Sequence, residues 1–506
     1  MSKLLSKAQN KLINTLKPTT QLASKTTAKP SVQLPSKEKA KPTTQQASAT
    51  QTKFSTVNKQ NSTATTTSIA STASHRLGIL GGGQLAQMLA LAAHPLQVQP
   101  HILSENPMDP AAQVTKWHYL SSLNSQLSTS DIQKNRDDFF RNIDSLTFES
   151  EFVDVKPLRS LLKKYPHLHV FPSLDIMETL QFRHLQKQFL LDHKIPTAEF
   201  LKIETPDDLQ KAFKKFKGRF VLKKSFGGYD GYGTFYIRSP QELQSWIQNL
   251  SHLKKTSQQK QNAKTSPAET YIAEAFVPFQ KELAIIFLRS QDGSLCQLPL
   301  VQSHQQDSRC DWVKGPIVHS KAHHLSQKIR KALQRIKYVG CIAFELFDTG
   351  SELLVNEVAP RVHNTGHYSQ LALSHSQFQL HVLAGLGHTL PTTPQVFGDF
   401  VMTNLIGQDL HSDSSSESSK SSAEKKAAAT QQRMQSELNN IKRITKNPTS
   451  QSSGLFARQT TGQFHWYGKT ETRPGRKMGH INYVGENQDQ LLKTALRERQ
   501  KIFKQG

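Results

Sequence analysis

Cysteine, acidic residues and long apolar runs are all scarce in this sequence. Its 506 residues include three cysteines, Cys296, Cys310 and Cys341, and no CxxC pair. This excludes a disulfide framework and a paired-cysteine zinc site, and it indicates a reducing compartment. No apolar run reaches the roughly 18 residues that a membrane helix needs, so we expect no membrane span.

Acidic residues number 39 against 64 lysines and arginines, which gives a net charge of +25. Residues 1–75 contain eleven lysines, one acid and few apolar residues, and this composition predicts a disordered basic extension. Such charge attracts nucleic acids, membrane surfaces or phosphorylated small molecules, but no aromatic-rich RNA-binding signature accompanies it. We therefore expect no nucleic-acid partner. We favour a bacterial cytoplasmic protein, with plastid targeting as the minor alternative.

A glycine-rich turn opens the region of mixed apolar and polar sequence that follows. Residues 75–86 read HRLGILGGGQLA, an apolar run that enters three glycines and continues into QLAQMLALAA. This is a strand, a tight turn and a helix, and the spacing Gly81-x-Gly83-x-x-Ala86 fits the dinucleotide fingerprint, with Glu105 about twenty residues on. A dinucleotide-binding oxidoreductase is therefore one alternative.

Strand-like and helix-like segments alternate after this turn. The alternation predicts a parallel α/β domain over residues 76–173. In the second region, 174–410, METLQFRHLQKQFL is typical of a helix and IPTAEFLKI begins a strand-rich part. Polar segments near residues 251–269 and 411–454 look like surface insertions. A small domain of short strands is expected at 455–506.

A lysine followed by glycines lies in VLKKSFGGYDGYG. Lys223 ends a predicted strand, and the loop contains Gly227, Gly228, Gly231 and Gly233. Backbone N–H groups of flexible glycines can approach phosphate oxygens, and the lysine adds positive charge. The spacing is not that of a P-loop, and a simple hairpin tip explains this segment equally well.

Pairs of acids follow on predicted strands. Glu274 and Glu282 flank apolar runs and could accept hydrogen bonds from ribose hydroxyls, although a solvated face is the simpler interpretation. Glu345 and Glu357 are expected on the two arms of a hairpin that turns at DTG, with Asn356 beside them. Two carboxylates and an amide on adjacent strands suit Mg²⁺, and without a cation their repulsion is costly.

Two segments are dense in cations. APRVHNTGHY places Arg361, His363, Asn364 and His367 within seven residues, and its Asn-Thr-Gly disfavours the helix that a zinc HxxxH pair needs. An arginine beside histidine and asparagine suits a small planar anion such as bicarbonate. YGKTETRPGRKMGH surrounds a Pro-Gly turn with four cations, whose density a phosphate ester would explain. A capped loop and a solvated turn are the respective alternatives.

Taken in order, these motifs resemble the 5-(carboxyamino)imidazole ribonucleotide synthase family, ATP-grasp enzymes of purine biosynthesis. The resemblance covers roughly residues 76–410 and 455–484 and rests most on NEVAPRVHNTGH and RPGRKMGH. It implies an α/β fold with a Rossmann-like pre-ATP-grasp domain, an ATP-grasp domain and a small β-rich C-terminal domain. It also implies a homodimer and a functional link to the mutase that acts next.

The family converts ATP, bicarbonate and 5-aminoimidazole ribonucleotide into the N-carboxylated ribonucleotide, ADP and phosphate through carboxyphosphate, with Mg²⁺ or Mn²⁺. The resemblance implies metal ligation by Glu345 and Glu357, and a role at bicarbonate and carboxyphosphate for Arg361, His363 and Asn364, with Lys223 as a further catalytic residue. ATP would be bound by Arg183, Lys223, Gly227, Gly228, Tyr229, Asp230, Gly231, Glu274, Ala275, Phe276, Val277, Glu282, Asn356 and Glu357. The ribonucleotide would be bound by Gln84, Leu85, Glu149, Lys469, Arg476 and Lys477.

Three positions depart from the family pattern. His304 in PLVQSHQQD lies one place earlier than the family's histidine, Ala86-Gln87 stands where Gly-Arg is usual, and Gln379 stands where an acid is common. None of them is an expected metal or carboxyphosphate residue. Another ATP-grasp ligase, such as a formate-dependent glycinamide ribonucleotide transformylase, is the alternative within the same fold.

Overall fold

The computed structural model describes residues 74–123, 130–228, 231–259, 270–407 and 461–504. The predicted basic extension up to residue 73 and the predicted insertion at 411–454 lie outside the described residues. None of the described helices combines the length and apolar character needed to cross a bilayer.

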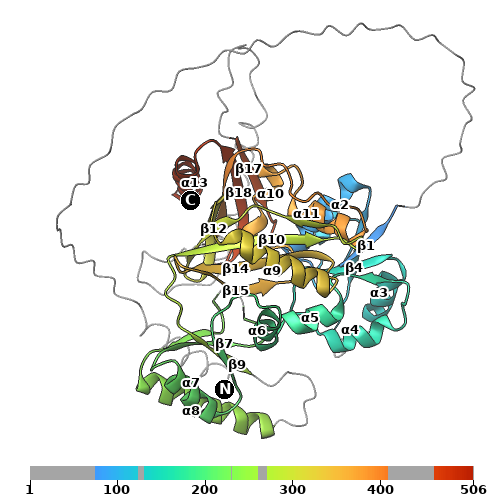
Figure 1. The fold of residues 1–506 in the computed structure, drawn as a ribbon. Helices are drawn as coiled ribbons and strands as arrows, with labels where there is room; N and C mark the ends of the chain where they lie inside the picture. Colours follow the sequence, from blue (N-terminus) through green and yellow to red (C-terminus); the bar gives the residue numbers. More distant parts are fainter. Residues whose placement is uncertain (1–73, 124–129, 229–230, 260–269, 408–460, 505–506) are drawn as a thin grey trace, which may run out of the picture. The chain divides into compact units, whose positions relative to one another are not determined.

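A parallel sheet in the order β3-β2-β1-β4-β5 forms the N-terminal part (Figure 1). This confirms the predicted parallel α/β arrangement, to which β3 is an addition that we did not predict. Its strands are β1 (Arg76–Leu80), β2 (Gln99–Ser104), β3 (Trp117–Leu120), β4 (Ser145–Phe148) and β5 (His169–Val170). Its helices are α2 (Gln84–Ala93), α3 (Ser130–Arg141) and α4 (Val155–Leu162), with the 3-10 turns η1 (His94–Leu96) and η2 (Ala112–Val114).

The single helix expected from METLQFRHLQKQFL is two helices, α5 (Leu174–Leu180) and α6 (Arg183–Asp192). The amide of Gln186 stabilises the break because it donates to the Leu180 carbonyl at 3.0 Å and to the Val358 carbonyl at 2.7 Å. The break has a consequence for the site, since α6 now begins at Arg183.

A small antiparallel sheet in the order β6-β9-β7-β8 follows. Helices α7 and α8 cover one of its faces (Figure 1), and their apolar side chains share a core with it. The elements are β6 (Phe200–Ile203), α7 (Pro206–Lys215), β7 (Phe220–Lys224), β8 (Thr234–Ile237), α8 (Pro240–Gln259) and β9 (Tyr271–Ala275). The first half of the polar segment 251–269 therefore continues α8, and 260–269 lie outside the described residues.

The largest sheet has the order β15-β14-β10-β12-β13-β16-β18-β17, with β11 also paired to β10. Its strands are β10 (Lys281–Arg289), β11 (Leu295–Gln297), β12 (Val301–Gln306), β13 (Arg309–Gly315), β14 (Gly340–Asp348), β15 (Leu353–Ala359), β16 (Asp399–Ile406), β17 (Thr461–Trp466) and β18 (Lys477–Gly485). Because β16 pairs with both β13 and β18, the C-terminal strands continue this sheet.

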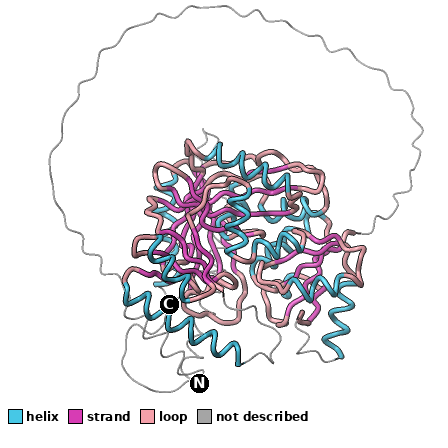
Figure 2. The backbone as a smooth tube through the Cα atoms, turned by 60° about the horizontal axis from the view of Figure 1, so that its bottom comes forward, coloured by secondary structure: helices cyan, strands magenta, loops and turns pink. Residues whose placement is uncertain are grey.

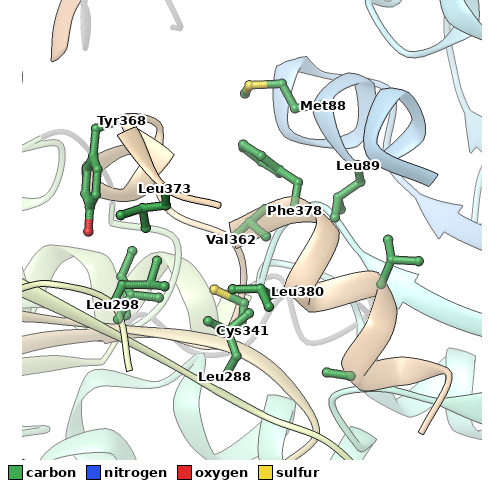
Figure 3. Close-up of a cluster of buried hydrophobic side chains, with 14 of the residues drawn as sticks. Met88, Leu89, Leu288, Leu298, Cys341, Val362, Tyr368, Leu373, Phe378 and Leu380 are labelled. Carbon is green, nitrogen blue, oxygen red and sulfur yellow. The ribbon is translucent and has the colours of Figure 1, made fainter. Parts of the chain in front are cut away.

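Helices (cyan) surround the strands (magenta) in Figure 2, and several of them pack against this sheet. They are α9 (Ala322–Arg335), α10 (Ser369–Ala372), α11 (Gln377–Gly385) and α13 (Gln488–Lys504), with the 3-10 turn η4 (Asn364–Gly366). Figure 3 shows Phe378 of α11 beside Leu89 of α2, and Leu380 of α11 close to Cys341 and Leu288 of the sheet. All five are buried, and each of the three leucines and the phenylalanine contributes about 1.5–3 kcal/mol. This shared core ties the glycine-rich turn to the strands that carry the acids.

Candidate active site

Three carboxylates lie on one face of the largest sheet. Glu345 on β14 is the direct cross-strand partner of Glu357 on β15 and of Ala284 on β10, and Glu282 lies two residues before Ala284. Burial raises the pKa of Glu345 to about 8, and the charges of Glu357 and Glu282 add to this effect. Burial also raises the pKa of Glu282 to about 7. Such a group of acids favours a cation between them.

A β-bulge brings Asn356 to the same site as Glu357. The register of β14 and β15 shifts between Glu345 and Leu346, which leaves one extra residue on β15. In a regular strand, consecutive side chains point to opposite faces, whereas a bulge can turn both to one face. Asn356 Oδ1 accepts from Lys223 Nζ at 2.8 Å, and Glu357 Oε2 pairs with Arg183 Nη1 at 2.8 Å.

Lys223, near the end of β7, contacts Asn356 and a further acid, Glu274. Its Nζ contacts Glu274 Oε2 at 2.7 Å as well as Asn356. Glu274 lies on β9, directly opposite Val221. Burial raises the pKa of Glu274, but the charges of Lys187 and Lys223 outweigh burial and hold the pKa at about 2. The predicted residues Lys223, Glu274 and Asn356 are therefore in contact.

Arg183 is held between the sheets at the first position of α6. Besides its pair with Glu357, its Nη2 donates to the carbonyl of Gly228 at 3.2 Å. The glycine-rich loop that contains Gly228 connects β7 to β8, and Gly227, Gly231 and Gly233 have positive φ values of 73°, 76° and 81°. Non-glycine residues rarely adopt this conformation. Tyr229 and Asp230 lie outside the described residues.

The segment after β9 is only partly covered. Ala275 and Val277 are half-buried, while Phe276 is 42% exposed and stacks beneath the Arg219 guanidinium, 5.3 Å from the ring centroid. The structure therefore leaves apolar surface open at this predicted ATP-binding segment.

Arg361 follows β15 and is held by Glu151, which lies just after β4. Its Nε contacts Glu151 Oε2, its Nη2 donates to Glu151 Oε1 at 3.0 Å, and its Nη1 donates to the Val362 carbonyl at 3.2 Å. Glu357 and Glu149 are also near enough to raise the pKa of Arg361. Glu151 thus fixes the direction of a guanidinium that two other acids attract.

His363 and Asn364 have different surroundings. His363 Nε2 lies 3.4 Å from Glu345 Oε1, and burial lowers the pKa of His363 well below its ordinary value, with Arg361 and Lys477 lowering it further. The amide of Asn364 makes a reciprocal pair with Asn404 on β16, at 3.0 and 2.7 Å. Arg361, His363 and the acids are thus brought together, while Asn364 is engaged with the neighbouring strand.

The glycine-rich turn before α2 binds a carboxylate of the chain itself. Glu149 Oε2 accepts from the Gly83 N–H at 2.7 Å, and Oε1 accepts from the Leu85 N–H at 3.3 Å. Helix N-termini favour anions, and here Glu149 occupies that position. The Gln84 side chain is half-buried beside it. Glu105, the acid of the dinucleotide pattern, is exposed and accepts from the Ser122 hydroxyl at 2.5 Å.

The cations of YGKTETRPGRKMGH have different surroundings. Lys469 is buried and donates to the Lys477 carbonyl at 2.6 Å, so it braces the loop. Arg476 is partly exposed and donates to the Glu471 carbonyl at 2.9 Å. Lys477 lies close enough to Glu345 for its positive charge to lower the pKa of that carboxyl, against the effect of burial. Lys477 therefore lies near the acids as well as near Arg476.

Two of the three departures have a local explanation. Gln379 forms a capping box with Ser376, in which its Oε1 accepts from the Ser376 N–H at 2.9 Å, so the amide does what an acid would do there. Gln87 donates to the Tyr467 carbonyl at 3.3 Å and joins α2 to the segment after β17. His304 is exposed and stacks on Trp312.

Sequence reasoning missed Lys187 and Glu151, which contact the residues that it identified. Lys187 lies in FRHLQKQFL, residues 182–190, and Glu151 lies in TFESE, residues 147–151. A lysine among apolar residues on a predicted helix is a usable signal, because lysine is almost never fully buried without a partner. No signal in the sequence indicated that Glu151 would meet Arg361.

Family models match three parts of the chain. The ribonucleotide synthetase preATP-grasp domain matches residues 74–181, the ATP-grasp domain matches 188–378, and the phosphoribosylaminoimidazole carboxylase C-terminal domain matches 401–494. Most of the site residues lie within these three matched parts, and Arg183 and Lys187 lie between the first two.

Curated and solved relatives agree with these matches. An N5-carboxyaminoimidazole ribonucleotide synthase of Synechococcus elongatus is 31% identical over 80% of this chain and 88% of its own length. The crystal structure of N5-carboxyaminoimidazole ribonucleotide synthetase from Thermus thermophilus has a TM-score of 0.63 at 27% identity, covering 83% of this chain and 97% of that one. The carboxyaminoimidazole ribonucleotide synthase of Aspergillus clavatus, solved with ATP, has a TM-score of 0.64 at 25% identity, covering 85% and 99%.

Proposed function

The chain belongs to the N5-carboxyaminoimidazole ribonucleotide synthase family, and we propose that the described site carries out this family's reaction. The chain is an ATP-dependent ligase of purine biosynthesis that carboxylates 5-aminoimidazole ribonucleotide. The observation that best supports the proposed site is the convergence of three cations on two adjacent residues of β15: Lys223 contacts Asn356, Arg183 pairs with Glu357, and Arg361 lies near enough to feel the charge of Glu357. A phosphate-transfer site needs this combination of fixed cations and acids.

ATP would lie between the small sheet and the largest sheet. We assign the phosphates to Lys223, Arg183 and the loop containing Gly227 and Gly228, because these supply positive charge and backbone N–H groups. Glu282, whose raised pKa reflects a poorly solvated carboxyl, would accept from a ribose hydroxyl. The half-covered segment Ala275–Val277 would contact the base. The other ATP residues keep the roles that the family resemblance implies.

Magnesium fits the pair Glu345 and Glu357. The two carboxylates are direct cross-strand partners, and, in addition to burial, the charge of Glu357 raises the pKa of Glu345, an effect that a dication would oppose. Among the described residues, no three His, Cys, Asp or Glu side chains are grouped as a metal site of their own. Mg²⁺ takes one or two carboxylates and completes its shell with phosphates and water, so the pair Glu345 and Glu357 would be enough to hold it. When bound, Mg²⁺ neutralises charge on the phosphates.

The first chemical step joins bicarbonate to the γ-phosphate. A bicarbonate oxygen attacks phosphorus, the bond to the ADP oxygen breaks, and carboxyphosphate forms. Lys223 and Arg361 would offset the charge that develops on the transferred group. His363 is neutral because of its lowered pKa, so it can donate one hydrogen bond to an anion without a charge of its own.

The second step transfers the carboxyl group. The exocyclic amine of the ribonucleotide attacks the carbon of carboxyphosphate, or the CO₂ released from it, and phosphate leaves. The amine proton passes to a carboxylate or to the departing phosphate. Water would destroy carboxyphosphate, so we assign the glycine-rich loop over β7 and β8 the role of a lid.

The ribonucleotide would bind beside α2. Arg476 and Lys477 would meet its phosphate, Lys469 would hold their loop, and Gln84 and Leu85 would form the adjacent wall. Glu149 is already engaged with the Gly83 and Leu85 N–H groups, so we assign it the shaping of this wall.

The family resemblance also supports a homodimer, a bacterial cytoplasmic location and a functional link to the downstream mutase. The three cysteines are free and buried, as is usual in a reducing compartment. Light scattering would test the dimer.

The proposed reaction is tested by following the carbon of bicarbonate into the product. The enzyme is incubated with ATP, Mg²⁺, ¹³C-bicarbonate and 5-aminoimidazole ribonucleotide, and the product is examined at once by NMR. We expect a ¹³C carbamate signal that depends on ATP. A ribonucleotide recovered without label while ATP is consumed would contradict the proposed acceptor.

A further inference from the structure

Lys187 is a buried lysine at the edge of the proposed ATP site. It lies on α6, one turn after Arg183, and its side chain is 2% exposed. Its Nζ lies 2.7 Å from Thr197 Oγ1, 3.1 Å from Glu274 Oε1 and 3.4 Å from the Val355 carbonyl. Two of the three ammonium N–H groups donate to Thr197 and to the Val355 carbonyl, while Glu274 Oε1 lies at ion-pair distance without the geometry of a hydrogen bond. The protein thus fixes the ammonium of Lys187, and its contact with Glu274 is electrostatic.

Glu274 connects Lys187 to Lys223. Its Oε1 faces Lys187, and its Oε2 lies 2.7 Å from Lys223 Nζ. Its side chain is 4% exposed, so this carboxylate has little water to solvate it. Burial lowers the pKa of Lys187 to about 8, while Glu274 opposes this effect.

The charge of this cluster depends on Lys187. Two lysines and one carboxylate sum to one positive charge, whereas Glu274 and Lys223 alone would sum to zero. In poorly solvated surroundings a carboxylate that pairs only with Lys223 would draw the ammonium toward itself. The ammonium of Lys223 would then interact less strongly with a phosphate.

We propose that Lys187 is a positioning residue of the ATP site. It holds one oxygen of Glu274, so that Glu274 does not neutralise Lys223, and Lys223 keeps its charge and direction for the phosphates. This inference rests on the proposed binding of ATP at Lys223. It assigns to Lys187 a function beyond the packing of α6 against β9.

The first experiment compares ATP affinity in the full chain. ATP is titrated by calorimetry, with Mg²⁺ and without the other substrates, into the wild type, Lys187→Met and the control Lys211→Met. Lys211 on α7 is 72% exposed and pairs with Asp208 at 3.2 Å, so its loss tests the removal of a lysine charge alone. We expect Lys187→Met to weaken ATP binding about tenfold and Lys211→Met to leave it unchanged. An unchanged affinity in folded Lys187→Met would overturn the inference.

A second pair of variants separates positioning from packing. Removing one member of a buried ion pair leaves an unpaired charge, whereas replacing both members is better tolerated. The double variant Lys187→Met with Glu274→Gln can therefore be measured even if Lys187→Met alone does not fold. We expect the double variant to bind ATP within twofold of Glu274→Gln alone, because Lys187 then has no carboxylate to act through. A further tenfold loss in the double variant would contradict this mechanism. Failure of the wild type to bind ATP would instead overturn the proposed function.

Discussion

Glu345 and Glu357 face each other as direct partners on β14 and β15, and a bulge places Asn356 beside Glu357. Two adjacent residues of β15 thus reach two different cations, Lys223 and Arg183. Acids of the largest sheet thus lie close to a lysine of β7 and an arginine of α6.

Glu357→Gln should abolish turnover, by at least about a hundredfold, because it removes a proposed metal ligand and the partner of Arg183. Steady-state ADP release at saturating Mg²⁺ measures the effect. Glu352→Gln, at the exposed turn of the same hairpin, is the control and should behave as the wild type. Normal turnover of Glu357→Gln would exclude the metal assignment.

Glu151→Gln should reduce kcat/KM for bicarbonate about tenfold or more, with little change in KM for ATP. The reason is that Arg361 loses a charge-assisted bidentate partner, and a bond of this kind contributes about 1.5–3 kcal/mol. Initial rates at varied bicarbonate test this, with Glu105→Gln as a control on the N-terminal sheet. Unaltered bicarbonate kinetics would show that Arg361 keeps its direction without Glu151.

His381→Gln tests the pH dependence of stability. His381 Nδ1 accepts from the Cys341 N–H at 2.9 Å, so its Nε2 carries the proton and lies 2.8 Å from Thr147 Oγ1, a contact of the neutral ring. Burial lowers the pKa of His381 to about 3. Between that value and the unfolded value near 6.5, unfolding takes up a proton, so stability falls as the pH falls.

From this shift, the free energy of unfolding of the wild type should lose about 2 kcal/mol between pH 7.5 and pH 5 through His381. The destabilisation caused by His381→Gln, measured by urea unfolding, should therefore be smaller at pH 5 by that amount. Equal destabilisation at the two pH values would show that His381 does not titrate in this way.

Arg476→Ala should chiefly raise KM for the ribonucleotide, about tenfold, because Arg476 is the proposed partner of its phosphate. Arg473→Ala is the matched control, since Arg473 lies on the same loop but is exposed and pairs with Glu471 at 3.0 Å. Michaelis–Menten kinetics at saturating ATP decide the matter. Equal KM values for the two variants would remove Arg476 from the phosphate site.

The sequence could predict the elements whose signals are local. Alternating segments predicted the parallel sheet, and the turn at DTG predicted the hairpin of Glu345 and Glu357, which the strand register confirms. The family resemblance also led to Arg183, Lys223 and Arg361. These predictions depended on short-range patterns and on motif order.

Other features depend on contacts between distant segments. The bulge at Asn356 results from one shift in the register of β14 and β15, and no residue type in the sequence predicts it. The pair of Glu151 and Arg361 joins residues that are 210 positions apart. The geometry of the glycine-rich turn suits an external anion, but the half-buried side chain of Glu149 accepts from its N–H groups. The roles of the site residues remain predictions to be tested by the variants above.

ADP release by the purified full chain, measured with each substrate omitted in turn, tests the central claim most directly. We predict rapid release with ATP, Mg²⁺, bicarbonate and 5-aminoimidazole ribonucleotide together, and strongly reduced release when bicarbonate or the ribonucleotide is left out. ADP release that is equally fast without the ribonucleotide and without bicarbonate would contradict the account.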